Sequence, residues 1–123
     1  MVDAVSHIHR QGSAKDGTHH WWVQRVTSVA LIPLSLWMVF SILGLLDADY
    51  MFFIGWIKAP WNATALALFV AVSYYHAWLG LQVVVEDYVH TPLTKVLTLL
   101  IIKFTLALLG ALALFSILKL SLT

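Results

Sequence analysis

Residues 73–90 carry the side chains whose types and spacing suit chemistry. This stretch passes through His76 inside an apolar run and ends near the neighbours Asp87 and Tyr88. On an α-helix, at about 100° and 1.5 Å per residue, His76, Gly80 and Asp87 share one face, and the carboxylate lies about 16 Å along the axis from the imidazole. The absent side chain of Gly80 leaves room beside the imidazole, as a flat, bulky ligand stacked on that face requires.

Each of these groups also has a purely structural interpretation. His76 can hydrogen-bond to a neighbouring helix, although ionisable residues inside a membrane are usually functional. An acid beside an aromatic residue is common where a helix leaves the bilayer. The pattern on this helix alone therefore leaves both a ligand-binding role and a packing role open.

The composition indicates that lipid is the solvent of this chain. Of its 123 residues, 61% are hydrophobic and 11% are charged, and the mean hydropathy is +0.87, which is too apolar for a soluble domain of this length. A net charge of +1 without a basic stripe gives no basis for nucleic-acid binding. The absence of cysteine excludes disulfides, thiolate zinc sites, a cysteine nucleophile and iron–sulfur ligation by this chain.

Three long apolar segments predict three transmembrane helices and an all-α fold. Each segment is long enough to cross the hydrocarbon core, which takes about 20 residues. We expect a polar N-terminal tail at 1–18 and a membrane-anchor domain at 19–123, with helices at about 22–46, 61–88 and 94–119. The amino end lacks the pattern of a removable signal peptide, so the first helix is expected to direct insertion.

The connections and charges predict how these helices sit in the membrane. Residues 47–60 carry acids and aromatic side chains and are expected to hold a short interfacial helix, and Pro33 predicts a mild kink in the first span. Basic residues concentrate on the side of the tail and of the second loop, which places the tail and the Asp87–Tyr88 pair in the cytoplasm or matrix. The basic residues on that side are Arg10, Lys15, Arg25 and Lys95, against Lys58 and Lys119 on the other.

Two basic residues lie within the spans or at their edge. Arg25, at the start of the first helix, either anchors to lipid phosphate or meets an anionic partner inside the bundle. Lys103 lies about 12 Å along the third helix from Lys95. We predict that its stem snorkels back to the interface; the alternative is an inward-facing ammonium that pairs with a carboxylate or a bound lipid phosphate.

The isolation of His76 favours haem iron over zinc as its metal partner. No other His, Asp or Glu shares its depth, so a tetrahedral zinc site would lack three ligands. A haem iron takes one axial ligand from each side, so a second polypeptide is expected to supply the other ligand. Arg25 lies on the cytoplasmic or matrix side, where it can meet haem propionates with help from His19 or His20.

The chain contains two specific motifs. One is His76-Ala77-Trp78-x-Gly80 followed by Asp87-Tyr88-Val89, and the other is Gln24-Arg25-x-Thr27. Together with the three-span layout, they resemble the small cytochrome b membrane-anchor subunit of bacterial succinate dehydrogenase (complex II). The likeness covers about residues 19–120 as architecture, and the first motif is strong because imidazole, acid and phenol recur at matching separations.

This resemblance implies roles for individual residues. His76 would be an axial ligand of haem b, and Arg25 would lie near the haem propionates, with His20 on the same side. Tyr88 would hydrogen-bond a ubiquinone carbonyl, and Asp87 would support that site. The chemistry suits these side chains, because a phenol at a water-accessible helix end can donate to the quinone oxygen as charge builds there, while a carboxylate relays the proton.

The resemblance also implies a complex. The chain would form half of a heterodimeric membrane-anchor helix bundle with a large anchor subunit, and it would tether an iron–sulfur subunit and a flavoprotein that oxidises succinate. It would contribute no catalytic residue to succinate oxidation itself. The expected location is the bacterial cytoplasmic (inner) membrane rather than the mitochondrial one, with the N-terminus in the cytoplasm and membrane lipid around the bundle.

Three alternatives remain open from the sequence. The chain could be a fumarate reductase anchor, which serves the reverse reaction, or a purely structural anchor without haem, in which His76 is only packed. A small proton or solute carrier is the third alternative. A carrier would need a continuous polar path, and the helix offers little besides Gln82 between His76 and its polar rim.

Overall fold

The computed structural model describes residues 2–123, with side chains from residue 17 onward. The described part contains four α-helices and no strand. The helices are α1 (Val2–Leu45), α2 (Tyr50–Lys58), α3 (Pro60–Tyr88) and α4 (Pro92–Leu122). The all-α fold predicted from the sequence is therefore confirmed.

Three segments within these helices are long and apolar enough to cross a membrane: Gly17–Leu45, Pro60–Tyr88 and Pro92–Leu122. This confirms the three predicted spans. Few of their side chains are buried within the chain. The buried hydrophobic core consists of Ile57, Leu79, Val85 and Ile117. Because so small a core cannot hold a chain of this length together in water, lipid or a partner must cover the remaining apolar surface.

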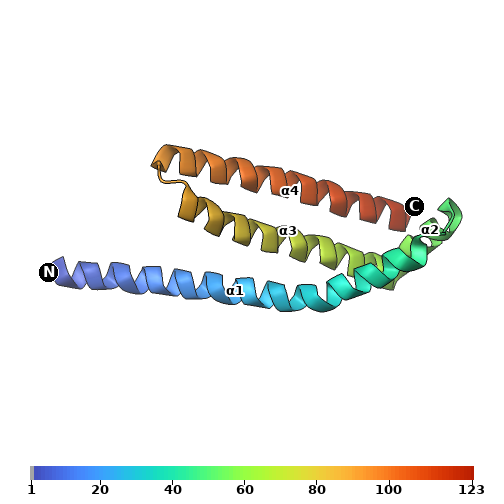
Figure 1. Cartoon of the computed structure of the whole chain (residues 1–123), viewed down its shortest axis with the longest axis horizontal. Helices are drawn as coiled ribbons and strands as arrows, with labels where there is room; N and C mark the ends of the chain where they lie inside the picture. The colour runs from blue at the N-terminus through green and yellow to red at the C-terminus, as the bar shows by residue number, and fades with distance from the viewer. Residues whose placement is uncertain (1) are drawn as a thin grey trace.

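The α3 helix lies at the centre of the bundle and packs against both α1 and α4. Figure 1 shows α3 and α4 side by side and antiparallel, with the two termini at opposite ends of the molecule. The short α2 lies at the end where α1 leads into α3, and it packs against α3 and α4. Between α3 and α4, the Tyr74 ring lies against Gly110, where an added Cβ would stand 3.5 Å from the ring. A glycine here therefore lets the two helices approach closely.

Local sequence sets the starts of the later helices. The α2 helix follows Asp49, whose carboxylate accepts a hydrogen bond from a backbone amide of the first turn at 2.8 Å. Pro60 and Pro92 occupy the first turns of α3 and α4. Proline lacks a backbone N–H, but an N–H at this position would have no partner within the helix, so no helical hydrogen bond is lost. The side chain of Asn62 donates to the carbonyl of Trp56 at 3.0 Å, which ties α3 to α2.

The first helix is longer than the sequence analysis predicts. Its expected start is about residue 22, whereas α1 begins at Val2. The sequence holds no proline before Pro33, so no residue forces the helix to begin at the apolar boundary. Figure 1 shows α1 bending in its cyan part, and the helix contains Pro33. The tail predicted at 1–18 falls mostly on residues whose side chains are not described, so that domain boundary stays a prediction.

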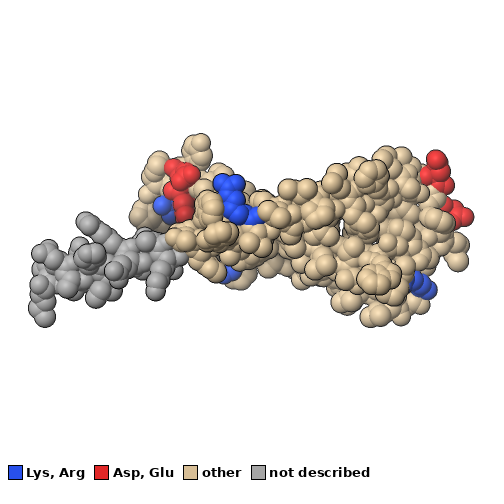
Figure 2. All heavy atoms as spheres, turned by 90° about the horizontal axis from the view of Figure 1, so that it is seen from below, with Lys and Arg blue, Asp and Glu red and all other residues tan. Residues whose placement is uncertain are grey.

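Charged side chains gather toward the two ends of the described part of the chain. On the face seen in Figure 2, a broad band without Lys, Arg, Asp or Glu separates the two groups. Such a band suits the hydrocarbon core of a bilayer, and the charged ends suit the headgroup regions.

Helix geometry indicates which residue of each span lies at the membrane boundary farther from α2. A stretch of about 20 residues crosses a hydrocarbon core of about 30 Å. Counted from the end of the bundle that carries α2, this length reaches Arg25 on α1, Gly80 on α3 and Ile102 on α4. On this count Lys103 lies beside the boundary rather than deep in the hydrocarbon.

Candidate functional site

His76 faces α1 and pairs with a hydroxyl on that helix. Its Nδ1 lies 2.8 Å from Oγ1 of Thr27, a residue that is only 8% exposed. The same Oγ1 lies 2.9 Å from the carbonyl oxygens of Val23 and Gln24. The hydroxyl has a single proton, so when it donates that proton to one of these carbonyls it can accept a hydrogen bond from Nδ1–H of His76.

The tautomer of His76 decides which ring nitrogen carries the lone pair. A neutral imidazole that is protonated at Nδ1 carries its lone pair on Nε2. Histidines that bind metals commonly donate their second ring N–H to an oxygen, which fixes the tautomer and the ring orientation. In the tautomer protonated at Nδ1, His76 would present Nε2 as the nitrogen with a free lone pair. Among residues 17–123, no group of three or more His, Cys, Asp or Glu side chains is placed to hold a metal ion, so His76 would act as one ligand without others from the described part.

His76 lines a pocket of about 530 Å³ that lies between α1 and α3. On α3 the wall is formed by His76, Gly80 and Val83, which share one face of the helix. The opposite wall belongs to α1 and comprises Gly17, His20, Trp21, Gln24, Arg25 and Ser28. The structure thus brings together three of the site residues predicted from the sequence, namely His76, Arg25 and His20.

Two polar atoms of the pocket residues lack a hydrogen-bond partner within the described part of the chain. These atoms, Nε2 of His20 and Oε1 of Gln24, are both buried. A buried polar atom without a partner costs about 1–3 kcal/mol, which a bound ligand or water would recover. Gly80 stands opposite, because a Cβ at this position would lie 3.9 Å from Nε2 of Gln24. A larger side chain at Gly80 would therefore project into the pocket.

Arg25 supplies the positive charge of the pocket. Its guanidinium carbon lies 5.4 Å from the centroid of the Trp21 ring, which is a cation–π contact. No carboxylate among the described residues forms an ion pair with it. An anionic group that enters this pocket would therefore meet a guanidinium whose charge is not already neutralised.

Asp87 and Tyr88 lie apart from this pocket, in the last turn of α3. Both are exposed, Tyr88 to 78%, and neither lines the pocket. By helix geometry, His76 lies about 6 Å inside the boundary at Gly80, whereas Asp87 lies about 10 Å outside it. The predicted quinone-binding pair therefore lies at a water-accessible level about 16 Å along α3 from His76, and it does not line the histidine pocket.

The contact of Thr27 with His76 is a feature of the site that the sequence analysis missed, although Thr27 belongs to a motif noted there. Thr27 is separated from His76 by 49 positions, and no spacing rule links residues on different helices. One feature of the sequence could have indicated this contact once α1 and α3 were known to be neighbours. Thr27 lies on the same side of α1 as the polar residues His20 and Gln24, and a hydroxyl on that side can hydrogen-bond a lone histidine of the neighbouring helix.

Comparison with known proteins gives this site a context. A family model described as the succinate dehydrogenase/fumarate reductase transmembrane subunit matches residues 4–116. The succinate dehydrogenase hydrophobic membrane anchor subunit of Rickettsia bellii is 45% identical over 78 residues, which are 63% of this chain and 62% of that protein. The corresponding subunit of Rickettsia typhi is 35% identical over 91 residues, or 74% of this chain and 73% of that protein.

A more distant relative aligns over a longer stretch. The succinate dehydrogenase membrane anchor subunit of Reclinomonas americana is 28% identical over 109 residues, which are 84% of this chain and 86% of that protein. The alignment with the Rickettsia bellii protein, by contrast, covers less than two thirds of its length. With the family model matching nearly the whole of the described part, the chain belongs to the family of succinate dehydrogenase and fumarate reductase transmembrane subunits.

Proposed function

We propose that this chain is the small membrane-anchor subunit of a succinate:ubiquinone oxidoreductase, which tethers a flavoprotein and an iron–sulfur subunit to the membrane and helps bind haem b and ubiquinone. The observation that carries this proposal is the hydrogen bond between His76 and Thr27. It leaves Nε2 of a histidine at membrane depth free to ligate iron, in a pocket that also contains an unpaired cation.

The residues of the pocket fit a haem b. His76 would ligate the iron through Nε2, while Gly80 leaves room for a flat macrocycle beside the imidazole. Arg25 and the orphaned Nε2 of His20 suit the propionates, which need positive charge and hydrogen-bond donors. Haem b, when bound, supplies a carrier for single electrons.

The proposed haem needs a second protein ligand. His76 is the one imidazole of the described part that lines this pocket at membrane depth, and His20 lies at its outer end. The pocket is bounded by α1 and α3 and is open on its remaining side, so a second subunit can approach the iron from there. The large anchor subunit is the proposed source of the second axial ligand.

Tyr88 and Asp87 are the proposed quinone-binding residues. Reduction of a quinone to a quinol takes two electrons, which come from succinate through the partner subunits, and two protons. The Tyr88 hydroxyl would donate a hydrogen bond to one quinone carbonyl oxygen and stabilise the negative charge that develops on it. Asp87, at the same water-accessible level, would pass protons from water to the reduced quinone, which takes up one proton on each of its two oxygens.

The proposed orientation places the N-terminus and the Asp87–Tyr88 pair on the cytoplasmic side of a bacterial inner membrane. Among residues 17–123, Arg25, Lys95 and Lys103 lie toward this side, and Lys58 and Lys119 lie toward the other. An excess of Lys and Arg marks the cytoplasmic side of membrane proteins.

A His76→Leu variant tests the haem ligand. In the purified complex, the α-band that appears on reduction with dithionite should be lost or shifted, while the head still oxidises succinate with a soluble artificial acceptor. Leucine suits the membrane depth, so the bundle should still assemble. His90→Leu is the matched control, because His90 is exposed in the loop after α3 and lies outside the pocket. An unchanged spectrum in His76→Leu would assign the ligand elsewhere, and a parent complex without an α-band would indicate a purely structural anchor.

A fumarate reductase anchor is the second candidate function, because the matched family includes subunits of both enzymes. Both enzymes can use the same anchor architecture, because the reaction of succinate or fumarate takes place in the flavoprotein and not in the anchor. The ratio of succinate oxidation by ubiquinone to fumarate reduction by a quinol, measured on the purified complex, decides between them.

A further inference from the structure

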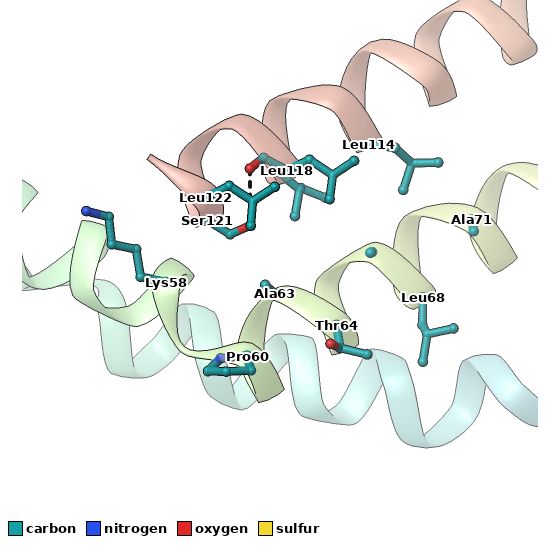
Figure 3. A pocket seen from close by; sticks show the side chains of 12 residues that line it. Lys58, Pro60, Ala63, Thr64, Leu68, Ala71, Leu114, Leu118, Ser121 and Leu122 are labelled. Carbon is teal, nitrogen blue, oxygen red and sulfur yellow. Dashed lines mark hydrogen bonds between the residues drawn. The ribbon is translucent and has the colours of Figure 1, made fainter.

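A second hollow of the molecule lies between α3 and α4, at the end of the bundle that carries α2. It is a groove of about 540 Å³. Figure 3 shows its lining side chains along α3 and α4, with Lys58 beyond the end where α3 begins and α4 ends. Ala63, Ala67 and Ala71 recur at one-turn intervals on α3, and leucines such as Leu118 cover the α4 side. The small alanine side chains leave the space that forms the groove.

The groove is as long as one leaflet of a bilayer is deep. From Pro60 to Ala71 the α3 axis rises about 16 Å, whereas one leaflet contributes about 15 Å of hydrocarbon. The groove also begins at the level where the three spans leave the membrane, since Pro60 and Leu122 both line its outer end. Its shape therefore suits an extended hydrocarbon chain that runs from the membrane surface to the midplane.

This groove faces away from the histidine pocket. Ala67 and His76 are nine positions apart in the sequence, which places them about 180° apart around α3. The histidine pocket lies on the α1 side of α3, whereas the groove lies on the α4 side. The two hollows are therefore formed by different sides of α3.

The size of the groove favours an occupant thinner than a helix. An α-helix with side chains is about 10 Å across, so a length of 16 Å would take up roughly 1,200 Å³. All the non-atom space of the groove, with its open side included, is about 1010 Å³. A single hydrocarbon chain is much thinner and can lie along the alanine wall in contact with both helices.

The charge at the outer end identifies the class of lipid. Lys58 is exposed in the last turn of α2 and is the one charged residue that lines the groove. Within the described part of the chain it forms no ion pair. An ammonium at headgroup level attracts phosphate, which an isoprenoid tail does not offer.

We propose that this groove binds a phospholipid of the leaflet opposite the Asp87–Tyr88 side, with one acyl chain along Ala63, Ala67 and Ala71 and its phosphate at Lys58. The lipid would fill the seam between α3 and α4 at the end where α2 closes the bundle. This inference does not depend on the proposed haem or quinone roles.

Two substitutions in the complex, purified in mild detergent, test the proposal. Ala67→Phe fills the groove and should remove about one tightly bound phospholipid per complex, counted by native mass spectrometry and by phosphorus content. Ala67→Ser, of nearly the same size as the parent, should retain it. Lys58→Gln should weaken retention about five-fold, the effect of one lysine at a membrane surface. Lys58→Arg should retain the lipid, and so should Lys119→Gln, which lies at the same end but outside the groove.

Other outcomes would overturn the proposal. An equal phospholipid count in the parent and Ala67→Phe would show that no lipid occupies the groove. A loss of quinone without a loss of phospholipid would assign the groove to a quinone tail. Dissociation of the large anchor subunit in Ala67→Phe, with Lys58→Gln retaining its lipid, would make the groove a subunit contact.

Discussion

Thr27→Val tests whether the hydroxyl on α1 positions the proposed haem ligand. Valine keeps the branched shape of threonine but cannot accept a hydrogen bond, so Nδ1–H of His76 would lose the oxygen that stands 2.8 Å away. An unsatisfied donor at this depth costs about 1–3 kcal/mol. Loss of such a partner typically lowers metal affinity about 10- to 100-fold, which corresponds to about 1.4–2.7 kcal/mol. The two ranges agree, so we expect haem affinity to fall by that factor.

The assay measures haem retained per complex during washing with a competing haem-binding protein, together with the reduction potential of the haem. Ser116→Ala is the matched control, because the Ser116 hydroxyl also donates to a helix carbonyl at 2.8 Å, that of Leu112, but lies outside the histidine pocket. Thr27→Ser keeps a hydroxyl and should restore most of the retention. The reasoning is refuted if Thr27→Val retains haem as the parent does with an unchanged potential, or if Ser116→Ala loses as much haem as Thr27→Val.

Three further predictions concern other described residues. Tyr88→Phe deletes one hydroxyl and should lower quinone reduction about 10- to 100-fold, the effect of about 1.4–2.7 kcal/mol from one lost hydrogen bond, with haem spectra unchanged; parent-level activity and inhibitor affinity would place the quinone elsewhere. Gly80→Leu should reduce haem content more than Gly80→Ala does, because the larger side chain projects toward Gln24; equal haem content in both variants would contradict a ligand against this face. Lys103→Met should leave assembly, haem content and quinone reduction near parent levels. The contact that it removes joins Nζ to the Trp78 ring, whose centroid is 6.0 Å away, and such an exposed contact is worth about 0.5–1 kcal/mol. A complex that dissociates in mild detergent would contradict this.

The spans and one face of the site were predictable because they depend on local periodicity. Apolar length alone locates α3 and α4, and the period of the α-helix places His76, Gly80 and Val83 on one face, where they line one pocket. The start of α1 was not predictable, because polar residues without proline are compatible with either a helix or a tail.

The contacts between helices could not be predicted from the sequence. The pairing of Thr27 with His76 depends on the rotation of α1 relative to α3. The small-residue contact at Gly110 sets the approach of α4 in the same way, through its Tyr74 neighbour. Such rotations follow from the packing of whole helix faces, which local propensity does not encode.

The separation of His76 from Tyr88 has a consequence for protons in the proposed function. The two residues are about 18 Å apart along α3 and lie on opposite sides of the boundary at Gly80. Quinone reduction consumes protons, and the hydrocarbon core holds no water to supply them, whereas the last turn of α3 is exposed. Between the two levels α3 is apolar apart from Gln82 and the rim residue Glu86. A haem at His76 would therefore exchange electrons without a proton path along this helix, and the protons for the quinone would come from the side of the membrane on which Asp87 and Tyr88 lie.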